Sequence, residues 1–160
     1  MIKFSNSDEI LNNMLNKGAF LVAGSDPKNV MTISWGFIGV MWYKPVMIVP
    51  VRTSRWTKQF IDGTGEFTVS VPVDKMQKEL TFCGTKSGRD TDKFKETGLV
   101  PKPAKKVKSS VVGGCDRYYE CKVVCKLPLT SDMLPEEIKK AAYGNNDYHT
   151  LYIGEIFAEY

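Results

Sequence analysis

The sequence lacks the residues that a metal centre needs. It has a single histidine, His149, and its four cysteines follow no C-x-x-C spacing. A structural zinc site uses four Cys or His ligands, usually from closely spaced pairs, so we expect no metal. In the segment YECKVVCKL, Cys121 and Cys125 alternate with charged residues. This pattern predicts a half-buried strand in which both cysteines serve as small apolar core residues.

Long apolar segments are absent as well. The longest apolar run, PVMIVPV, is far shorter than the ~20 residues of a membrane-spanning helix. The first residues, MIKFSNSDEI, are polar and acidic, whereas a secretion signal has a basic segment followed by an apolar one. These two absences predict a cytoplasmic protein without a membrane contact.

The chain has only a small excess of positive charge. Its formal net charge is +4, with 25% of the residues charged, whereas nucleic-acid-binding domains more often have a stronger basic excess or a recognisable motif. We therefore expect no nucleic-acid partner. Hydrophobic residues make up 42% of the 160 residues, which is enough to form a core. We expect residues 1–160 to form a single domain.

The patterns that are present predict a mainly β fold with peripheral helices. Regular alternation of strands and helices, which marks a doubly wound parallel sheet, is missing. We therefore expect an antiparallel β-barrel with Greek-key-like connections. Strands are expected at residues 19–24, 29–42, 45–52, 66–73, 119–127 and 148–160, and helices at residues 10–15, 54–62, 74–84, 89–98 and 134–144.

Glycine and proline refine these expectations. Gly36 and Gly39 interrupt the segment 29–42, which predicts one bent strand or two strands closely joined. Pro50 has no N–H to donate, so it predicts an edge or bulge position for its strand. Gly63 is expected to end the helix that begins near Ser54.

The segment VPVRTSRWTKQF places cations and hydroxyls where a strand is followed by a helix. If the helix begins near Ser54, its free N–H groups and its dipole favour an anion there. Arg52, Arg55 and Lys58 can add charge-assisted hydrogen bonds, and Ser54 and Thr57 can add hydroxyls. A phosphate site is one interpretation. The other is that Ser54 only caps the helix and the cations form a solvated face.

A second polar cluster lies in CGTKSGRDTDKF. Glycine-rich turns expose consecutive N–H groups that can bind an anion. The alternative is an ordinary loop in which Arg89 forms surface ion pairs with Asp90 or Asp92. Two such clusters in one short chain favour a phosphorylated ligand. The candidate residues of the second cluster are Thr85, Lys86, Ser87, Arg89 and Lys93, beside Gly84 and Gly88.

The chain resembles the flavin reductase-like family over nearly its whole length. The resemblance rests on the order of its motifs: a T-x-S strand in NVMTISWGFIGVMW, a K-P turn and strand in YKPVMIVPV, the helix start R-x-S-R-x-T-K, then F-T-V-S-x-P and CGTKSGRD. The family implies an FMN-binding split barrel and a homodimer with FMN at or near the subunit interface. It includes NAD(P)H-dependent flavin reductases and flavoredoxin-like electron carriers.

The resemblance also implies site residues. The strand beside the flavin ring would contain Thr32 and Ser34 as polar contacts, and the loop after CGT could reach the flavin of the other subunit. Phe37 and Pro50, near the ring site, depart from the family pattern. The implied FMN contacts are Asn29, Met31, Thr32, Ile33, Ser34 and Trp35 near the ring, Arg52, Ser54, Arg55, Thr57 and Lys58 at the phosphate, and Ser87, Arg89 and Lys93 from the binding loop.

Two functions follow from the resemblance. The first is a flavin reductase that uses NADH or NADPH to transfer a hydride to FMN. The second is an electron carrier that holds FMN tightly and exchanges electrons with a redox partner protein. Neither needs a side-chain acid or base, which agrees with the single histidine. We expect His149 to be structural. Trp35 and Trp42 could both wall the ring, but tryptophans in a barrel more often lie in the core, which is what we expect of Trp42.

Overall fold

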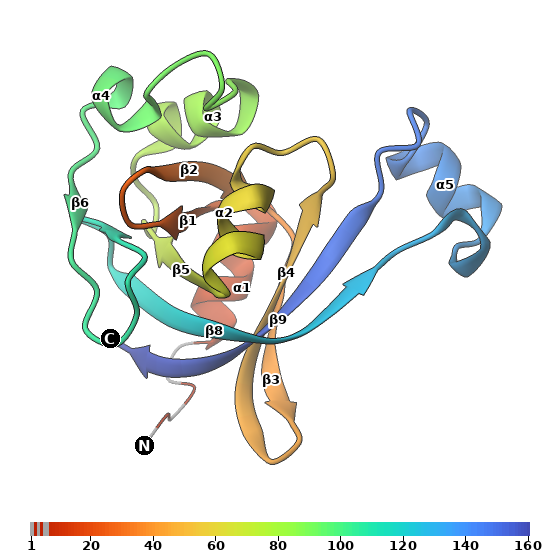
Figure 1. Ribbon diagram of the computed structural model, residues 1–160, viewed down its shortest axis with the longest axis horizontal. Helices are drawn as coiled ribbons and strands as arrows, with labels where there is room; N and C mark the ends of the chain where they lie inside the picture. Colours follow the sequence, from red (N-terminus) through yellow and green to blue (C-terminus); the bar gives the residue numbers. More distant parts are fainter. Residues whose placement is uncertain (1, 3, 5–6) are drawn as a thin grey trace.

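Seven strands form one antiparallel sheet in the computed structural model, which describes residues 2, 4 and 7–160 (Figure 1). The strands lie in the order β2-β1-β5-β8-β9-β4-β3, and β6 and β7 form a separate two-stranded sheet. The strands are β1 (Ala19–Gly24), β2 (Lys28–Ile33), β3 (Phe37–Met41), β4 (Lys44–Arg52), β5 (Glu66–Val71), β6 (Pro101–Lys102), β7 (Val111–Val112), β8 (Arg117–Pro128) and β9 (His149–Glu159). The helices are α1 (Ser7–Asn16), α2 (Thr57–Thr64), α3 (Gln77–Thr85), α4 (Lys93–Thr97) and α5 (Glu136–Ala142), with a 3-10 turn at Ser131–Met133.

The sheet is curled but open, with β2 and β3 as its two edges. Within the described residues, β2 pairs only with β1, and β3 only with β4. Figure 1 shows α3 and α4 on one side of β1 and β2, and α5 at the end of an arm formed by β8 and β9. The expected mainly β, antiparallel fold with peripheral helices is confirmed. Among the residues that the structure describes, no helix is long and apolar enough to cross a bilayer.

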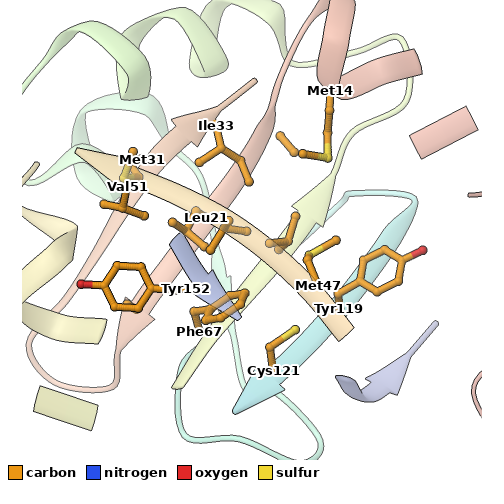
Figure 2. Packing of buried hydrophobic residues seen from close by; sticks show 14 of the residues in the cluster. Met14, Leu21, Met31, Ile33, Met47, Val51, Phe67, Tyr119, Cys121 and Tyr152 are labelled. Carbon is orange, nitrogen blue, oxygen red and sulfur yellow. The ribbon is translucent and has the colours of Figure 1, made fainter. Parts of the chain in front are cut away.

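The main core fills the inside of the curled sheet. Figure 2 shows Leu21, Met47, Phe67 and Tyr152 converging there, and Met14 of α1 packs at one end. A second cluster, which includes Phe20 and Val22 on the other face of β1, packs under α3 and α4. Since both faces of β1 are covered, all six of its residues are buried.

The segment 29–42 forms two strands rather than one. β2 ends at Ile33 and β3 begins at Phe37, with Gly36 in the connection, and the two strands lie at opposite edges of the sheet. Gly39 lies inside β3 and interrupts nothing. A Cβ added at Gly36 would lie 2.5 Å from Cε of Met14 and 3.2 Å from the Ile48 carbonyl oxygen, so a side chain here would displace the end of Met14.

The helix after β4 begins and ends later than expected. It starts at Thr57, whereas Ser54 lies in a preceding turn in which the Arg55 N–H donates to the Arg52 carbonyl. Gly63 lies inside the helix, and Gly65, with a φ of 66°, ends it. The expected start near Ser54 is therefore wrong, and so is the alternative that Ser54 caps this helix, because residue 56 occupies the cap position.

Pro50 and Trp42 correct two further expectations. β4 is not an edge strand, because β3 and β9 pair with its two sides. The pairing with β3 ends at Ile48, however, so at Pro50 only β9 is paired with the strand. Trp42 does not lie in the core. It forms the β3–β4 turn with Tyr43, where both residues have positive φ values of 53° and 58°, and its side chain is 54% exposed.

The alternation in β8 holds only in part. Cys121 is fully buried and Cys125 is half-buried, because the strand changes register between Val123 and Cys125. Glu120, on the face expected to be solvated, is also fully buried. Its carboxylate accepts hydrogen bonds from the N–H groups of Lys105 and Lys106 and from the hydroxyl of Tyr160. A loop that the sequence pattern could not place therefore covers this face.

Gly154 gives a test of the core packing. A Cβ added there would lie 2.6 Å from Cζ of Phe67 and 2.8 Å from Cβ of Cys121, and both neighbours are fully buried. We expect Gly154→Ala to lower the free energy of unfolding by about 1–3 kcal/mol, the usual penalty of overpacking. Gly39→Ala is the matched control, since nothing lies within 4 Å of its added Cβ. Equal urea midpoints for the two variants would contradict this packing.

Candidate functional site

Two adjoining cavities lie where β2, β4 and β9 end near α2 and α3. The strand cavity, of ≈ 230 Å³, is lined by Met31, Thr32, Ile33, Ser34, Trp35, Pro50, Arg52, Arg55 and His149. The cation cavity, of ≈ 300 Å³, is lined by Asn29, Met31, Arg52, Ser54, Arg55, Trp56, Thr57, Thr85, Lys86, Ser87, Gly88, Arg89, Lys93 and Asp147. They share Met31, Arg52 and Arg55 and therefore lie side by side; the two together are called the groove below.

Arg52, at the end of β4, is held by the segment that enters β9. Its guanidinium donates to the carbonyl oxygens of Asp147, at 2.7 Å, and Ala142, at 2.9 Å. The same group lies 5.1 Å from the centroid of the Tyr143 ring, a cation–π contact. These contacts fix the direction of the guanidinium without neutralising its charge.

Three other cations of the cavity are held in the same way. The guanidinium of Arg55 donates to the Gly84 carbonyl at 2.8 Å, and that of Arg89 donates to the Ser54 carbonyl at 3.0 Å. The Lys93 ammonium donates to the Cys83 carbonyl at 2.8 Å, and Lys93 is only 3% exposed. Each acceptor is a neutral carbonyl oxygen rather than a carboxylate.

Positive charge therefore accumulates in the cation cavity. Among the described residues, none of its five cations forms an ion pair with a carboxylate (Arg52, Arg55, Lys86, Arg89 and Lys93). Burial, and then the charge of Arg52, lower the pKa of Arg55. Burial also lowers the pKa of Lys93 to about 8. Both shifts indicate that an anion bound here would stabilise the charged forms.

The hydroxyls of the cavity have protein partners. The Asp147 carboxylate accepts from the Ser54 N–H at 3.0 Å and from the Ser54 hydroxyl at 2.5 Å. The Thr57 hydroxyl oxygen accepts from the side-chain amide of Asn29 at 2.8 Å. Ser54 thus ties the strand–helix junction to the segment before β9, and Asp147 is the one carboxylate residue that the described part of the chain places on the cavity wall.

Lys58 lies away from both cavities. Its ammonium is 2.6 Å from the Asp62 carboxylate, which also accepts from Lys126 at 2.8 Å and from the Tyr152 hydroxyl at 3.0 Å. Burial alone would raise the pKa of Asp62, but the hydrogen bonds from Lys126, Lys58 and Tyr152 lower it to about 2. Because the helix begins at Thr57, Lys58 points along α2 toward Asp62 rather than into the groove.

The strand cavity has two aromatic side chains, Trp35 and His149, on its wall beside Arg52 and Arg55. The His149 ring centroid lies 5.0 Å from that of Trp35, and its Nδ1 lies 2.7 Å from the Tyr143 hydroxyl oxygen. Burial and the charge of Arg52 lower the pKa of His149 to about 4, so the imidazole is neutral at pH 7. The Thr32 hydroxyl donates to the Leu80 carbonyl at 2.6 Å.

The structure brings together all the expected site residues except Lys58. Phe37 lies outside the groove, with its side chain 63% exposed. In the second cluster, Arg89 binds the Ser54 carbonyl, and Asp92 caps α4 by accepting from the Phe94 N–H. The ion pairs considered for this loop do not form in the described residues.

Sequence reasoning missed three residues of the groove. His149 was expected only as a structural residue, and Trp56 and Asp147 were not among the candidate site residues. The register that pairs Arg52 with His149 is a long-range property of β4 and β9, and no local pattern reveals it. The N-N-D-Y-H order before β9 gives a turn signal at most.

Comparisons with known proteins agree with this geometry. A family model described as flavin reductase like domain matches residues 13–159. An uncharacterized protein of Archaeoglobus fulgidus is 31% identical over 137 residues, which cover 85% of this chain and 67% of that protein.

Solved structures of the same fold are also similar. A flavoredoxin from Methanosarcina acetivorans has a TM-score of 0.69 and 25% identity, covering 90% of this chain and 67% of that one. The FMN-binding domain of a flavin reductases-like enzyme from Shewanella baltica has a TM-score of 0.66 and 20% identity, covering 94% and 72% of the two chains. The split-barrel fold expected from the sequence is confirmed. This chain spans about two thirds of the length of the Archaeoglobus and Methanosarcina proteins.

The titration of His149 tests the environment of the strand cavity. Because the sequence has one histidine, a protein without a histidine tag shows a single imidazole C2–H resonance. We expect this resonance to titrate with a pKa of about 4, since burial and Arg52 oppose protonation. NMR spectra recorded from about one pH unit below this value up to pH 8 measure it. A midpoint near the ordinary value of 6.5 would show that the ring is solvated and away from Arg52.

Proposed function

This chain belongs to the flavin reductase-like domain family, and from that membership we propose that it binds FMN and acts as an NAD(P)H-dependent flavin reductase. The observation that carries the proposal is the cation cavity. Its cations are fixed by carbonyl oxygens and left without carboxylate partners in the described residues, and it adjoins the strand cavity, which is lined by the end of β2. A phosphate ester attached to a flat ring matches both parts.

The residues present fit FMN. Arg55 and Arg89 would hold the phosphate, because guanidinium groups match phosphate oxygens and are already oriented. Together the volumes of the two cavities, ≈ 230 and ≈ 300 Å³, fall within the range of about 300–1,000 Å³ typical of ligand sites. The end of β2 and Trp35 would line the ring. Lys58 is left out of this proposal because Asp62 holds its ammonium.

Bound FMN supplies hydride and electron-transfer chemistry that protein side chains lack. The residues of this chain would bind FMN, orient its ring and tune its reduction potential. Arg52 and Arg55 border both cavities, so their charges would favour negative charge on the ring as well as on the phosphate. Neutral His149, held by Tyr143, can offer a hydrogen bond without adding charge. Trp35 and Pro50 would exclude water from their side of the cavity.

A flavoredoxin-like electron carrier is the second candidate. The similarity to the Methanosarcina flavoredoxin favours it. In that case FMN would be held tightly, electrons would come from a redox partner protein, and NADH and NADPH would not be used. Both candidates use the same groove, so the groove alone does not separate them. The cytoplasmic location expected from the sequence stays a prediction.

We also propose a homodimer, formed through the β3–β4 hairpin. This hairpin exposes Phe37, Val40, Trp42 and Tyr43 by 63%, 69%, 54% and 103%, and an exposed apolar cluster commonly marks an interface. Trp42 and Tyr43 also occupy positive-φ turn positions that suit Asn-Gly far better. Their presence there is explained if their side chains contact a second copy of the chain.

Replacement of the turn tests the homodimer. Trp42→Asn with Tyr43→Gly removes the two aromatic side chains and introduces a sequence that favours this turn. We therefore expect a monomer in which the hairpin itself is not destabilised. Multi-angle light scattering gives the mass of the variant and of the unchanged protein. A dimeric variant would place the interface elsewhere, and a monomeric unchanged protein would refute the dimer.

Substitutions at two neighbouring cations test the phosphate assignment. Arg55→Gln removes a charge from the cation cavity, so we expect FMN affinity to fall about 10–100-fold, as for one or two lost charge-assisted hydrogen bonds. Lys58→Gln is the matched control and should leave the affinity unchanged, because Lys58 pairs with Asp62. Fluorescence titration of the apoprotein with FMN measures both. A larger loss for Lys58→Gln would contradict the assignment.

The reductase and the carrier are separated by their response to nicotinamide nucleotides. The FMN-loaded protein is mixed anaerobically with NADH or with NADPH, and the visible absorbance of the oxidised flavin is followed. A reductase loses this absorbance within its turnover time, and we expect that result. If neither nucleotide bleaches the flavin while dithionite does, the carrier replaces the reductase.

A further inference from the structure

Asp147 directs its carboxylate at the hydrogen-bond donors of Ser54 rather than at a cation. The Ser54 N–H donates to one carboxylate oxygen at 3.0 Å, and the Ser54 hydroxyl donates to the other at 2.5 Å. Both donors belong to the junction between β4 and α2, which lines the cation cavity. One carboxylate thus takes both of the hydrogen bonds that Ser54 can donate at this wall.

The Asp147 carboxylate has the chemistry of the ligand proposed for the cation cavity. A carboxylate and a phosphate are both anions whose oxygens accept hydrogen bonds, so they bind the same N–H and O–H donors. The charge of Asp147 also acts on a cation that would hold the phosphate. Burial and the charge of Arg52 lower the pKa of Arg55, and the charge of Asp147 opposes this shift. The carboxylate therefore lies within the field of these cations.

The backbone around Asp147 is held independently of its carboxylate. The Asp147 carbonyl oxygen accepts from the Arg52 guanidinium at 2.7 Å. The carbonyl oxygen of the next residue, Tyr148, accepts from the Thr53 N–H at 3.1 Å. Neither bond uses the carboxylate, so a rotation of the Asp147 side chain can free both donors of Ser54 while the segment stays in place.

We propose that Asp147 is a specificity-determining residue that competes with the phosphate of FMN for the two donors of Ser54. A bound phosphate would accept from these donors, and the Asp147 side chain would turn away, because two anions at one wall repel each other. Riboflavin, which has no phosphate, would leave the contact between Asp147 and Ser54 intact. This inference rests on the proposed flavin site and deepens it.

The competition bears on whether FMN is exchanged or kept. It lowers the affinity for FMN by the cost of breaking the contact between Asp147 and Ser54, and a lower affinity favours release. A reductase that passes reduced FMN on as a free product needs this release, whereas a carrier that keeps its flavin bound does not. Asp147 therefore favours the reductase, with FMN as an exchangeable substrate.

Asp147→Asn tests the competition, because an amide can replace both hydrogen bonds without the charge. Its oxygen can accept from the Ser54 N–H, and its NH₂ group can donate to the Ser54 hydroxyl oxygen. Fluorescence titration of each apoprotein gives the dissociation constants for FMN and riboflavin. We expect Asp147→Asn to bind FMN at least about tenfold more tightly than the unchanged protein, as for one charge-assisted hydrogen bond that no longer has to be broken. Riboflavin affinity should stay unchanged.

Asp90→Asn is the matched control for charge alone. Asp90 follows Arg89 in the chain and is exposed, but it lines no part of the cation cavity. Its substitution should change FMN affinity by less than about threefold, as for an exposed charge that is screened by salt. Circular dichroism melts check that the variants fold. If Asp147→Asn does not fold, Asp147→Ser takes its place in the same titrations.

A double-mutant cycle with Ser54→Ala separates a shared donor from a general effect of charge. With Asp147 present, loss of the Ser54 hydroxyl removes one charge-assisted bond before FMN binds and one after, so the affinity should change little. In the Asp147→Asn protein, the same loss removes a neutral bond before binding and a charge-assisted bond after it. We expect FMN affinity to fall about tenfold there.

Weaker or unchanged FMN binding by Asp147→Asn would show that Asp147 only supports the junction, and it would overturn the inference. An equal gain in Asp90→Asn, or equal effects of Ser54→Ala in the two backgrounds, would overturn it as well. In each of these results FMN binding by the unchanged protein still supports the proposed function. Failure of the unchanged protein to bind FMN would overturn the proposed function itself.

Discussion

The structure depends on one arrangement: cations that are oriented by backbone carbonyl oxygens and not neutralised by carboxylates. Arg52, Arg55, Arg89 and Lys93 each donate to a carbonyl oxygen, which fixes their positions but leaves their charge. Like charges brought together in a partly buried place repel each other and lose hydration. Burial, and to a smaller extent the charge of Arg55, lowers the pKa of Lys93 for this reason. A bound dianion would offset both the repulsion between the cations and their lost hydration, which is the physical reason to expect a phosphate here.

The same carbonyl contacts join segments that are far apart in the sequence. Arg52 ties the end of β4 to residues 142–147, Arg55 ties the strand–helix junction to the end of α3, and Arg89 ties the loop after α3 back to Ser54. The groove therefore forms only when the sheet is curled and α3 is packed. Ligand binding and stability of this end of the barrel are coupled through these bonds, since any ligand that neutralises the cations also stabilises the contacts they make.

The sequence predicted those parts of the fold and site that depend on local interactions, and not those that depend on contacts between distant segments. Periodicity and turn residues placed β1, β5, β9 and most helices, because those signals are local. They also found both cation clusters. They could not predict partners that come from distant segments. Lys58 forms an ion pair with Asp62 outside the site, and the Ser54 hydroxyl donates to Asp147. His149 lines the cavity because its residue pairs with Arg52 in the sheet. Trp42 was misplaced because hydrophobicity was taken to mean burial, whereas the two-residue turn exposes it.

The most direct test of the central claim compares FMN with riboflavin, two ligands that differ only in the phosphate. If unneutralised cations hold that group, isothermal titration at low salt should show FMN binding at least about 100-fold more tightly, as expected for two or more charge-assisted hydrogen bonds. The difference should shrink as salt screens the charges. Equal affinities for the two ligands would show that the cation cavity does not receive the phosphate and would contradict the account given for this site.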